Sequence, residues 1–257
     1  MAKVTLIAYT PSPDQLVAQA ARLCYSSASV GEIGDSLTPQ KAASLVEMLE
    51  NMGHGSPTEH ASFTFGIEGV SRSFLAQITR HRIASYSVKS QRYVDERNFS
   101  FVIPPEIDAV PEARTEFLEA MEEDRKRYES ISSLLREKHK KRLMDSGKPE
   151  KQAGSEARKL AGEDARFVLP NACMTQMICT FDARSLNHFF SLRCCNRAQW
   201  EIRGVAIQML RLVRQAAPAL FCKAGPPCVK GACPEGKMTC GRAEEVRAFF
   251  SRLGTNP

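Results

Sequence analysis

The spacing of apolar side chains predicts a series of strands and helices along this chain. Segments that alternate apolar and polar residues, the pattern of a half-buried strand, cover residues 4–9, 61–70 and 172–181. Segments with apolar residues three and four positions apart, the pattern of an amphipathic helix, cover residues 14–24, 39–52, 71–81, 112–145, 155–167, 183–195 and 198–220. Polar or Gly- and Pro-rich stretches, which we expect to be loops, cover residues 31–38, 53–57, 145–155 and 222–241.

These elements predict an α+β fold without an internal repeat or a clear linker. We expect one domain over residues 1–221, followed by a Cys-, Gly- and Pro-rich tail with a short helix over residues 222–257. Gly-x-Gly-x-x-Gly does not occur in the sequence, so the pattern favours a non-Rossmann fold.

Composition is that of a globular protein with a mild preference for anions. The chain has 257 residues, of which 43% are hydrophobic and 25% charged, and a formal net charge of +6. The charge favours nucleotides, nucleic acid or a membrane surface as partners, and a mildly basic surface is an equally simple interpretation. The sequence has no apolar run of membrane-spanning length and no secretory signal at its start, so we expect a cytoplasmic location.

A basic and hydroxyl-rich run gives the first candidate site. Its polar side chains are Arg80, His81, Arg82, Ser85, Ser90, Arg92 and Tyr93. Arginine forks bind phosphate and serine hydroxyls fill remaining acceptor positions, although a solvated helix end is the common alternative for such a cluster. Like charge on both sides would disfavour protonation of His81 unless an anion were bound there.

Three further segments carry candidate groups. The first, residues 54–60, reads His-Gly-Ser-Pro-Thr-Glu-His and lacks the helical His spacing of a zinc protease. Next, Arg166 stands beside a helix stop and could be an ordinary C-terminal helix cation. In the third, residues 182–203, Arg184 and His188 share a helix face, while periodicity alone assigns Leu186, Phe189, Phe190 and Leu192 to the core.

Together these segments resemble the flavin-dependent thymidylate synthases, the ThyX family. That family has the signature Arg-His-Arg-x-x-Ser followed by x-Asn-x-x-Ser-x-Arg, which residues 80–92 match except that Ser87 replaces the Asn. The family also has a His-x-x-x-x-Glu-His segment, an Ala-Arg-x-x-Leu-Pro segment and an Asn-Ala-Arg-Ser-Leu segment, the last beginning here with Asp182. These blocks occur in the family's order over about residues 50 to 210.

The resemblance implies a fold and a reaction. The fold is α+β and ThyX-like, with a twisted, mainly antiparallel sheet flanked by helices, assembled as a homotetramer whose sites are shared between subunits. The reaction is reductive methylation of dUMP to dTMP, with methylenetetrahydrofolate as carbon donor and FAD reduced by NADPH as hydride carrier.

The resemblance also implies residue roles. Arg193 matches the catalytic arginine that activates uracil. Residues that match dUMP contacts are Gln77, Ile78, Thr79, Arg80, Ser90, Gln91, Arg92, Arg166 and Arg193. Residues that match FAD contacts are His54, Ser56, Arg80, His81, Arg82, Asp182, Arg184 and His188.

The cysteines are not expected to carry the chemistry. Cys194 and Cys195 could suggest a nucleophile, but members of the family lack an essential cysteine there. Without a secretory signal, nine cysteines are expected to be thiols or metal ligands rather than disulfides. The tail cysteines Cys222, Cys228, Cys233 and Cys240 leave zinc, free thiols and a disulfide open, although their spacing does not form Cys-x-x-Cys pairs.

A nucleic-acid-binding protein is the alternative class. It would use the arginine clusters for phosphates and the cysteine tail as a knuckle. Aromatic residues make up only 7% of the chain and fall mostly in apolar segments, so bases would have few stacking platforms.

Overall fold

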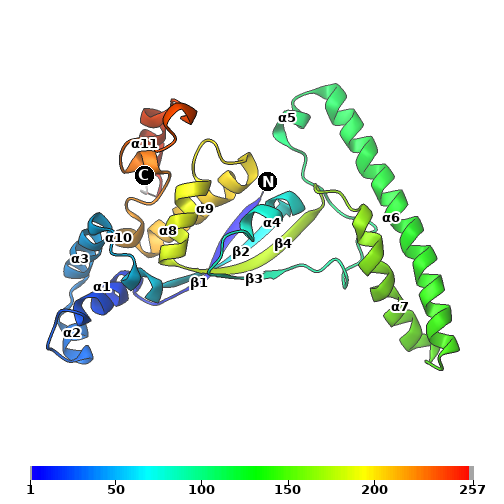
Figure 1. Ribbon diagram of the computed structural model, residues 1–257, viewed down its shortest axis with the longest axis horizontal. Helices are drawn as coiled ribbons and strands as arrows, with labels where there is room; N and C mark the ends of the chain where they lie inside the picture. The colour runs from blue at the N-terminus through cyan, green and yellow to red at the C-terminus, as the bar shows by residue number, and fades with distance from the viewer. Residues whose placement is uncertain (1, 255–257) are drawn as a thin grey trace. The chain divides into compact units, whose positions relative to one another are not determined.

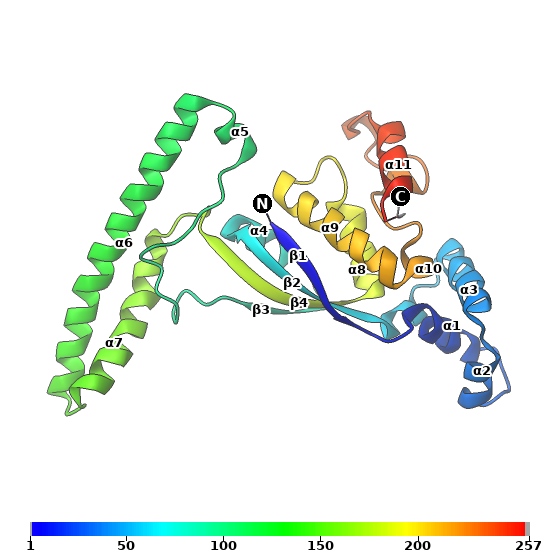
Figure 2. The ribbon, with the colours of Figure 1, turned by 180° about the vertical axis from the view of Figure 1, so that it is seen from behind.

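The computed structural model describes residues 2–254, which divide into two compact units (Figures 1 and 2). The core unit contains residues 2–68, 77–87 and 177–254. The hairpin unit contains residues 69–76 and 88–176. Each is described below by itself.

A four-stranded sheet organises the core unit. Its strands are β1 (Lys3–Tyr9), β2 (Ser62–Ser71), β3 (Ala84–Val88) and β4 (Met174–Asp182), in the order β1-β2-β4-β3. β1 pairs antiparallel with β2, from Lys3 opposite Glu68 to Tyr9 opposite Phe63, with an irregularity between Leu6 and Ala8. The expected α+β class and the strands near residues 4–9, 61–70 and 172–181 are confirmed.

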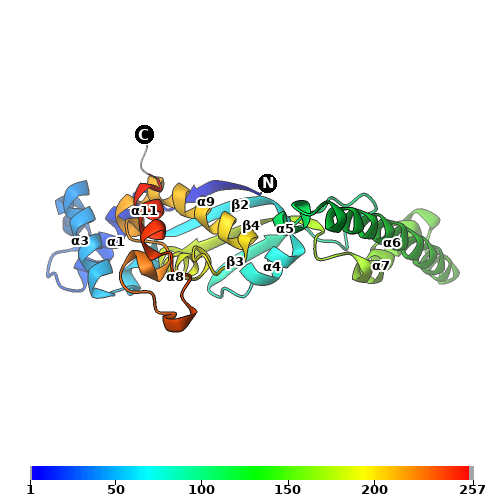
Figure 3. The same ribbon diagram turned by 90° about the horizontal axis from the view of Figure 1, so that it is seen from above.

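One face of the sheet is apolar. The side chains of Phe63, Phe65 and Ile67 alternate inward along β2 and are fully buried. Their counterparts on β4 include Phe181, whose ring centroid lies 5.7 Å from that of Phe189. Helices α8 (Ala183–Arg193) and α9 (Trp200–Ala216) lie beside the strands, as Figure 3 shows from above. The sheet therefore provides the base on which α8 is held.

The other elements of the core unit are mostly short. They are α1 (Pro13–Leu23), α2 (Val30–Ser36), α3 (Pro39–Met52), η1 (Ser56–His60), α10 (Pro218–Phe221), η3 (Pro227–Val229), η4 (Gly236–Met238) and α11 (Ala243–Arg252). The expected helices at residues 14–24 and 39–52 are confirmed, and the tail contains the expected short helix.

Two long helices dominate the hairpin unit. They are α6 (Pro111–Asp145) and α7 (Glu150–Ala165), which lie side by side in all three views, preceded by α5 (Pro105–Asp108) and followed by η2 (Arg166–Val168). Ala153, Ala157 and Ala161 are completely buried at a spacing of four residues, which allows the two helices to approach closely. Helix α4 (Arg72–Ile78) begins in this unit, where the Ser71 hydroxyl accepts the Phe74 amide as the expected cap.

Two expected loops are helical. Residues 31–38 were expected to be a loop because of their polar residues and glycines, yet they contribute most of α2. Ser29 and Glu32 form a reciprocal capping box there, and a Cβ on Gly34 would lie 2.9 Å from Gln19 Nε2. Similarly, α7 begins at Glu150 rather than at residue 155, because Gly154 is tolerated within a helix packed through small residues.

Two further boundaries differ from the expectation. Residues 84–88, which were not assigned to a strand or helix from the sequence, form the edge strand β3. The helix expected over residues 198–220 is interrupted, because Pro218 lacks the amide needed to continue α9 and instead begins α10. Among residues 2–254, no helix combines the length and apolar character required to cross a membrane.

Candidate functional site

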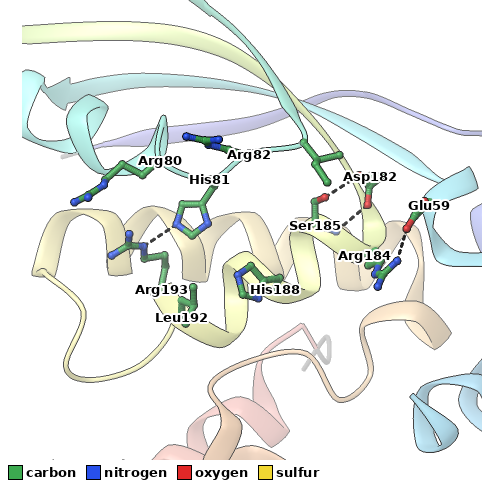
Figure 4. Close-up of a pocket in the computed structure, with 11 residues that line it drawn as sticks. Glu59, Arg80, His81, Arg82, Asp182, Arg184, Ser185, His188, Leu192 and Arg193 are labelled. Atoms are coloured by element: carbon green, nitrogen blue, oxygen red, sulfur yellow. Dashed lines mark hydrogen bonds and ion pairs between the residues drawn. The ribbon is translucent and has the colours of Figure 1, made fainter. Parts of the chain in front are cut away.

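A cavity of about 630 Å³ lies within the core unit, between the arginine-rich loop after α4 and one face of α8 (Figure 4). It is lined by Glu59, Arg80, His81, Arg82, Ile83, Asp182, Arg184, Ser185, His188, Leu192 and Arg193. Four arginines face two carboxylates, with two histidines among them, so the cavity carries a net positive charge. Such a donor set suits phosphate groups and planar anions such as carboxylates.

Helix α8 presents its polar face to the cavity. Asp182 caps the helix: its Oδ1 accepts the Ser185 amide at 2.8 Å and its Oδ2 accepts the Ser185 hydroxyl at 2.8 Å. Arg184 and His188 follow on one face, and Arg193 ends the helix. The buried Phe189 and Phe190 on the opposite side fix the rotation of α8 against the sheet.

The arginine-rich loop is held by a tyrosine on β3. The Tyr86 hydroxyl donates a bifurcated hydrogen bond to the carbonyl oxygens of Ile78 at 2.8 Å and His81 at 2.9 Å. Burial raises the pKa of Tyr86, so the phenol remains a donor. Ile83 takes a φ of 62°, a left-handed conformation that is strained for a β-branched residue. The loop therefore has one defined backbone conformation, which includes conformational strain at Ile83.

His81 and Arg193 meet inside the cavity. Arg193 Nε donates to His81 Nε2 at 2.8 Å. The His81 ring is 9% exposed and lies edge-on to Phe189, with centroids 4.9 Å apart. Burial, then the positive charge of Arg193 and the neighbouring His188, lower the pKa of His81 to about 4. The imidazole is therefore neutral near pH 7 and can accept.

Arg184 spans the other end of the cavity. Its guanidinium forms an ion pair with Glu59 of η1, and both side chains are more than half exposed. A Cβ on Gly55 would lie 3.2 Å from Arg184 Nε, so the glycine allows the arginine to lie across this turn. An exposed pair of this kind contributes little stability and can open at low cost.

The remaining expected phosphate ligands lie in the hairpin unit. Arg92 pairs with Glu163 at 3.2 Å, and Arg166 Nε donates to the Glu163 carbonyl oxygen at 3.1 Å. Two of the arginines expected to bind phosphate therefore contact the same residue, Glu163. Ser90 accepts the Arg92 amide at 3.3 Å, while the Gln91 side chain is buried and its Nε2 donates to Cys173 Sγ at 3.6 Å.

The cavity gathers most, but not all, of the expected FAD residues. Arg80, His81, Arg82, Asp182, Arg184 and His188 line it, together with the expected catalytic Arg193. His54 and Ser56 do not line it and are exposed in the turn around Gly55. Among the expected dUMP contacts, Arg80 and Arg193 line the cavity, Gln77, Ile78 and Thr79 precede it in the core unit, and Ser90, Gln91, Arg92 and Arg166 belong to the hairpin unit.

Some residues that line the cavity were not predicted from the sequence to be site residues. Leu192, expected in the core, is 47% exposed and lines the cavity, because it follows the polar face of α8. Ser185 has a usable signal, since it stands three residues after the helix cap Asp182. The only sequence signal for Glu59 is its place in the His-Gly-Ser-Pro-Thr-Glu-His segment, residues 54–60. No sequence pattern indicates that Ile83 lines the cavity.

The cysteines of the described residues are unpaired, and one of those expected not to react, Cys194, is deeply buried. All nine are free thiols in the structure. Cys194 is buried, and this burial raises the pKa of its thiol far above neutral pH. Within residues 2–254, no group of three or more histidine, cysteine or acidic side chains is placed to hold a metal ion.

The chain is similar to one protein family over most of its length. A family model described as "Thymidylate synthase complementing protein" matches residues 5–219. A relative from Clostridium tetani named "Flavin-dependent thymidylate synthase" is 50% identical over 248 residues, 96% of each chain. Relatives of the same name from Geobacter sulfurreducens and Pyrococcus abyssi are 46% and 37% identical, covering 98% and 100% of this chain and 99% and 100% of their own lengths.

Proposed function

This chain belongs to the flavin-dependent thymidylate synthases and is an enzyme, and we propose that it converts dUMP to dTMP with FAD, NADPH and methylenetetrahydrofolate. The observation that carries the proposal is the convergence of Arg80, Arg82, Arg184 and Arg193 with two histidines on one cavity. The nucleic-acid-binding alternative is not supported, because relatives that cover nearly the whole chain carry the enzyme's name.

The cavity residues fit a flavin dinucleotide. FAD carries a pyrophosphate, and the exposed arginines Arg80, Arg82 and Arg184 supply fork-shaped donors for it. His188 and the Asp182–Ser185 cap add further polar groups for the rest of the cofactor. When bound, the flavin would accept a hydride from NADPH and deliver it to the substrate. No Gly-x-Gly-x-x-Gly occurs, and the proposed flavin site is of the non-Rossmann, ThyX-like kind.

Arg193 is the proposed catalytic residue. A guanidinium against the oxygen and nitrogen edge of uracil stabilises negative charge on the pyrimidine and makes C5 nucleophilic, without a cysteine adduct. By analogy with a single oxyanion donor, such a contact contributes about 2.7–4 kcal/mol to transition-state stabilisation. The buried, protonated Cys194 is consistent with this route, because a thiol of raised pKa is a poor nucleophile.

The nucleotide phosphate has its own proposed ligands. Ser90, Arg92 and Arg166 supply a hydroxyl and two guanidinium groups, and the two arginines share Glu163 as a neighbour. Release of Arg92 from this exposed ion pair would cost little compared with a phosphate contact. In a homotetramer, which is the proposed assembly, these residues can serve a site that includes the cavity residues of another copy.

Domain organisation and location remain part of the proposal. We assign the catalytic domain to residues 1–221 and the tail to residues 222–257, and we propose a cytoplasmic location.

Light scattering tests the proposed homotetramer. The mass of the protein in solution should be four times that of one chain. A stable monomer with full activity would contradict the shared-site assembly.

A flavin assay tests the proposed reaction. The purified protein should be yellow, or gain flavin absorbance with added FAD, and it should oxidise NADPH faster when dUMP is present. With methylenetetrahydrofolate it should form dTMP. A protein that remains colourless with FAD and forms no dTMP would rule out the proposed cofactor and reaction.

A further inference from the structure

We propose that His81 is a positioning residue for Arg193: its imidazole accepts the Nε–H of the arginine and orients the guanidinium toward the bound pyrimidine. The inference rests on the proposed function, since it assigns a role in orienting the catalytic arginine. It adds to the expected contact of His81 with FAD a second task in the same cavity.

His81 is held both at its backbone and at its ring. Its backbone amide donates to the Ile78 carbonyl oxygen at 3.0 Å, and its own carbonyl oxygen accepts the Tyr86 hydroxyl at 2.9 Å. The ring packs edge-on against Phe189, which is completely buried. An acceptor held this rigidly can define the direction of the Arg193 Nε–H bond.

The hydrogen bond to His81 leaves both terminal amino groups of the Arg193 guanidinium free to bind a ligand. Arginine has five N–H donors, and His81 takes only the one on Nε. Within residues 2–254, the Arg193 side chain makes no other hydrogen bond or ion pair, so both terminal amino groups are available. The terminal pair is the fork that recognises a planar ligand edge.

A neutral acceptor also preserves the charge of the arginine. A carboxylate in place of His81 would hold the guanidinium but would cancel much of its field at the substrate. The imidazole can accept at Nε2 only while neutral, which places its proton on Nδ1. The groups whose charge acts on His81 are Arg193 and His188 of α8. Arg80 and Arg82 adjoin it in the loop, and the two carboxylates of the cavity are engaged elsewhere, Glu59 with Arg184 and Asp182 with Ser185. This environment, together with burial, favours the neutral form.

Two amide variants form a matched test. In His81→Gln the amide oxygen can reach about the position of Nε2, whereas in His81→Asn it stays near that of Nδ1 and cannot reach Arg193. In flavin-loaded proteins of equal Tm, we expect His81→Gln to keep the dUMP dissociation constant and kcat within a few-fold of wild type. His81→Asn should weaken dUMP binding and lower kcat by about tenfold, equivalent to about 1.4 kcal/mol.

A double-mutant cycle decides whether the effect passes through Arg193. We expect dUMP to bind His81→Asn/Arg193→Ala no more weakly than Arg193→Ala alone, because the histidine would have nothing left to orient. Losses that multiply, equal losses for the Gln and Asn variants, or full recovery of His81→Asn at saturating FAD would overturn the proposal. A flavin-loaded wild type that binds dUMP but forms no dTMP would instead reject the proposed function.

Discussion

Tyr86 and Ile83 act at the scale of single residues, because they define the loop that carries the cavity's arginines. The tyrosine hydroxyl satisfies two carbonyl oxygens of the turn, and the isoleucine accepts a left-handed φ of 62°. Strained residues of this kind cost about 1–3 kcal/mol and occur preferentially at ligand sites. The loop shape is therefore formed before a ligand arrives.

Removal of the Tyr86 hydroxyl should loosen that loop. We expect Tyr86→Phe to lower the free energy of unfolding by about 1 kcal/mol, because the ring still fills its place while one hydrogen bond is lost. Ligand binding should suffer more than stability, since the carbonyls of Ile78 and His81 lose their common donor. Chemical denaturation and FAD titration measure the two effects, and an unchanged FAD affinity would contradict the assigned role.

The depressed pKa of His81 makes a part of the stability depend on pH. The folded-state value is about 4 and the ordinary value is 6.5, so only the unfolded chain takes up this proton between those limits. The contribution is present above pH 6.5 and is lost as the pH falls toward 4. Comparison of denaturation curves should show that wild type loses stability relative to His81→Gln over this window, with a slope of at most about 1.4 kcal/mol per pH unit. Parallel curves for the two proteins would contradict the shift.

The role of Arg193 in catalysis should be separable from flavin binding. We expect Arg193→Ala to lose dTMP formation by about 100-fold or more, because one preorganised donor to the developing charge is removed. Its flavin content should stay near that of wild type, since Arg80, Arg82 and Arg184 remain in the cavity. Product assay and flavin absorbance check both statements; turnover at the wild-type level would exclude Arg193 as the catalytic residue.

At the scale of elements, helix packing decides where side chains can be presented. α8 presents arginines because two phenylalanines on its other face are buried against the core unit. α7 packs on α6 through alanines, and η2, which begins with Arg166, follows directly at its end. The position of an expected phosphate ligand thus depends on a small-residue contact within the hairpin unit.

Overpacking of that contact should be costly. Ala157 is completely buried between α6 and α7, so Ala157→Leu should lower the free energy of unfolding by about 1–3 kcal/mol. Gln152→Leu, at an exposed position of α7, provides the control and should alter stability by less than about 0.5 kcal/mol. Thermal denaturation of both variants gives the comparison; equal effects would mean that the helices do not pack tightly.

At the scale of the whole molecule, one arginine of α9 binds several carbonyl oxygens of the C-terminal tail within the core unit. Arg214 of α9 donates to the carbonyl oxygens of Phe221, Cys222, Ala224, Phe250 and Leu253. Burial lowers the pKa of this arginine, yet its donors remain satisfied. These hydrogen bonds therefore help to order the tail, together with the Arg197–Glu235 and Lys230–Glu50 ion pairs.

Loss of Arg214 should release the tail. In Arg214→Met the stem is kept while the donors are lost, leaving several carbonyl oxygens without their partner at a cost of more than about 3 kcal/mol. We expect faster tryptic cleavage within residues 222–254 and a lower Tm. Arg211→Met, at an exposed position of the same helix α9 and outside the scored region, controls for the loss of a positive charge. Unchanged protection of the tail in Arg214→Met would contradict this role.

The sequence by itself determined the family, the α+β class, the main helices and the cationic character of the site. These depend on local periodicity and on side-chain chemistry that a motif such as residues 80–92 contains in full. Capping boxes, small-residue packing and an edge strand were missed at α2, α7 and β3, because their signals are weaker than those of glycine and polarity.

Only the tertiary structure decided which groups meet. His81 and Arg193 are 112 positions apart, and no pattern along the chain indicates that one accepts a hydrogen bond from the other. The same holds for Tyr86 beneath the loop carbonyls and for the exposure of Leu192. Such contacts depend on how the sheet and α8 pack, and packing joins residues by geometry in space rather than by spacing in sequence.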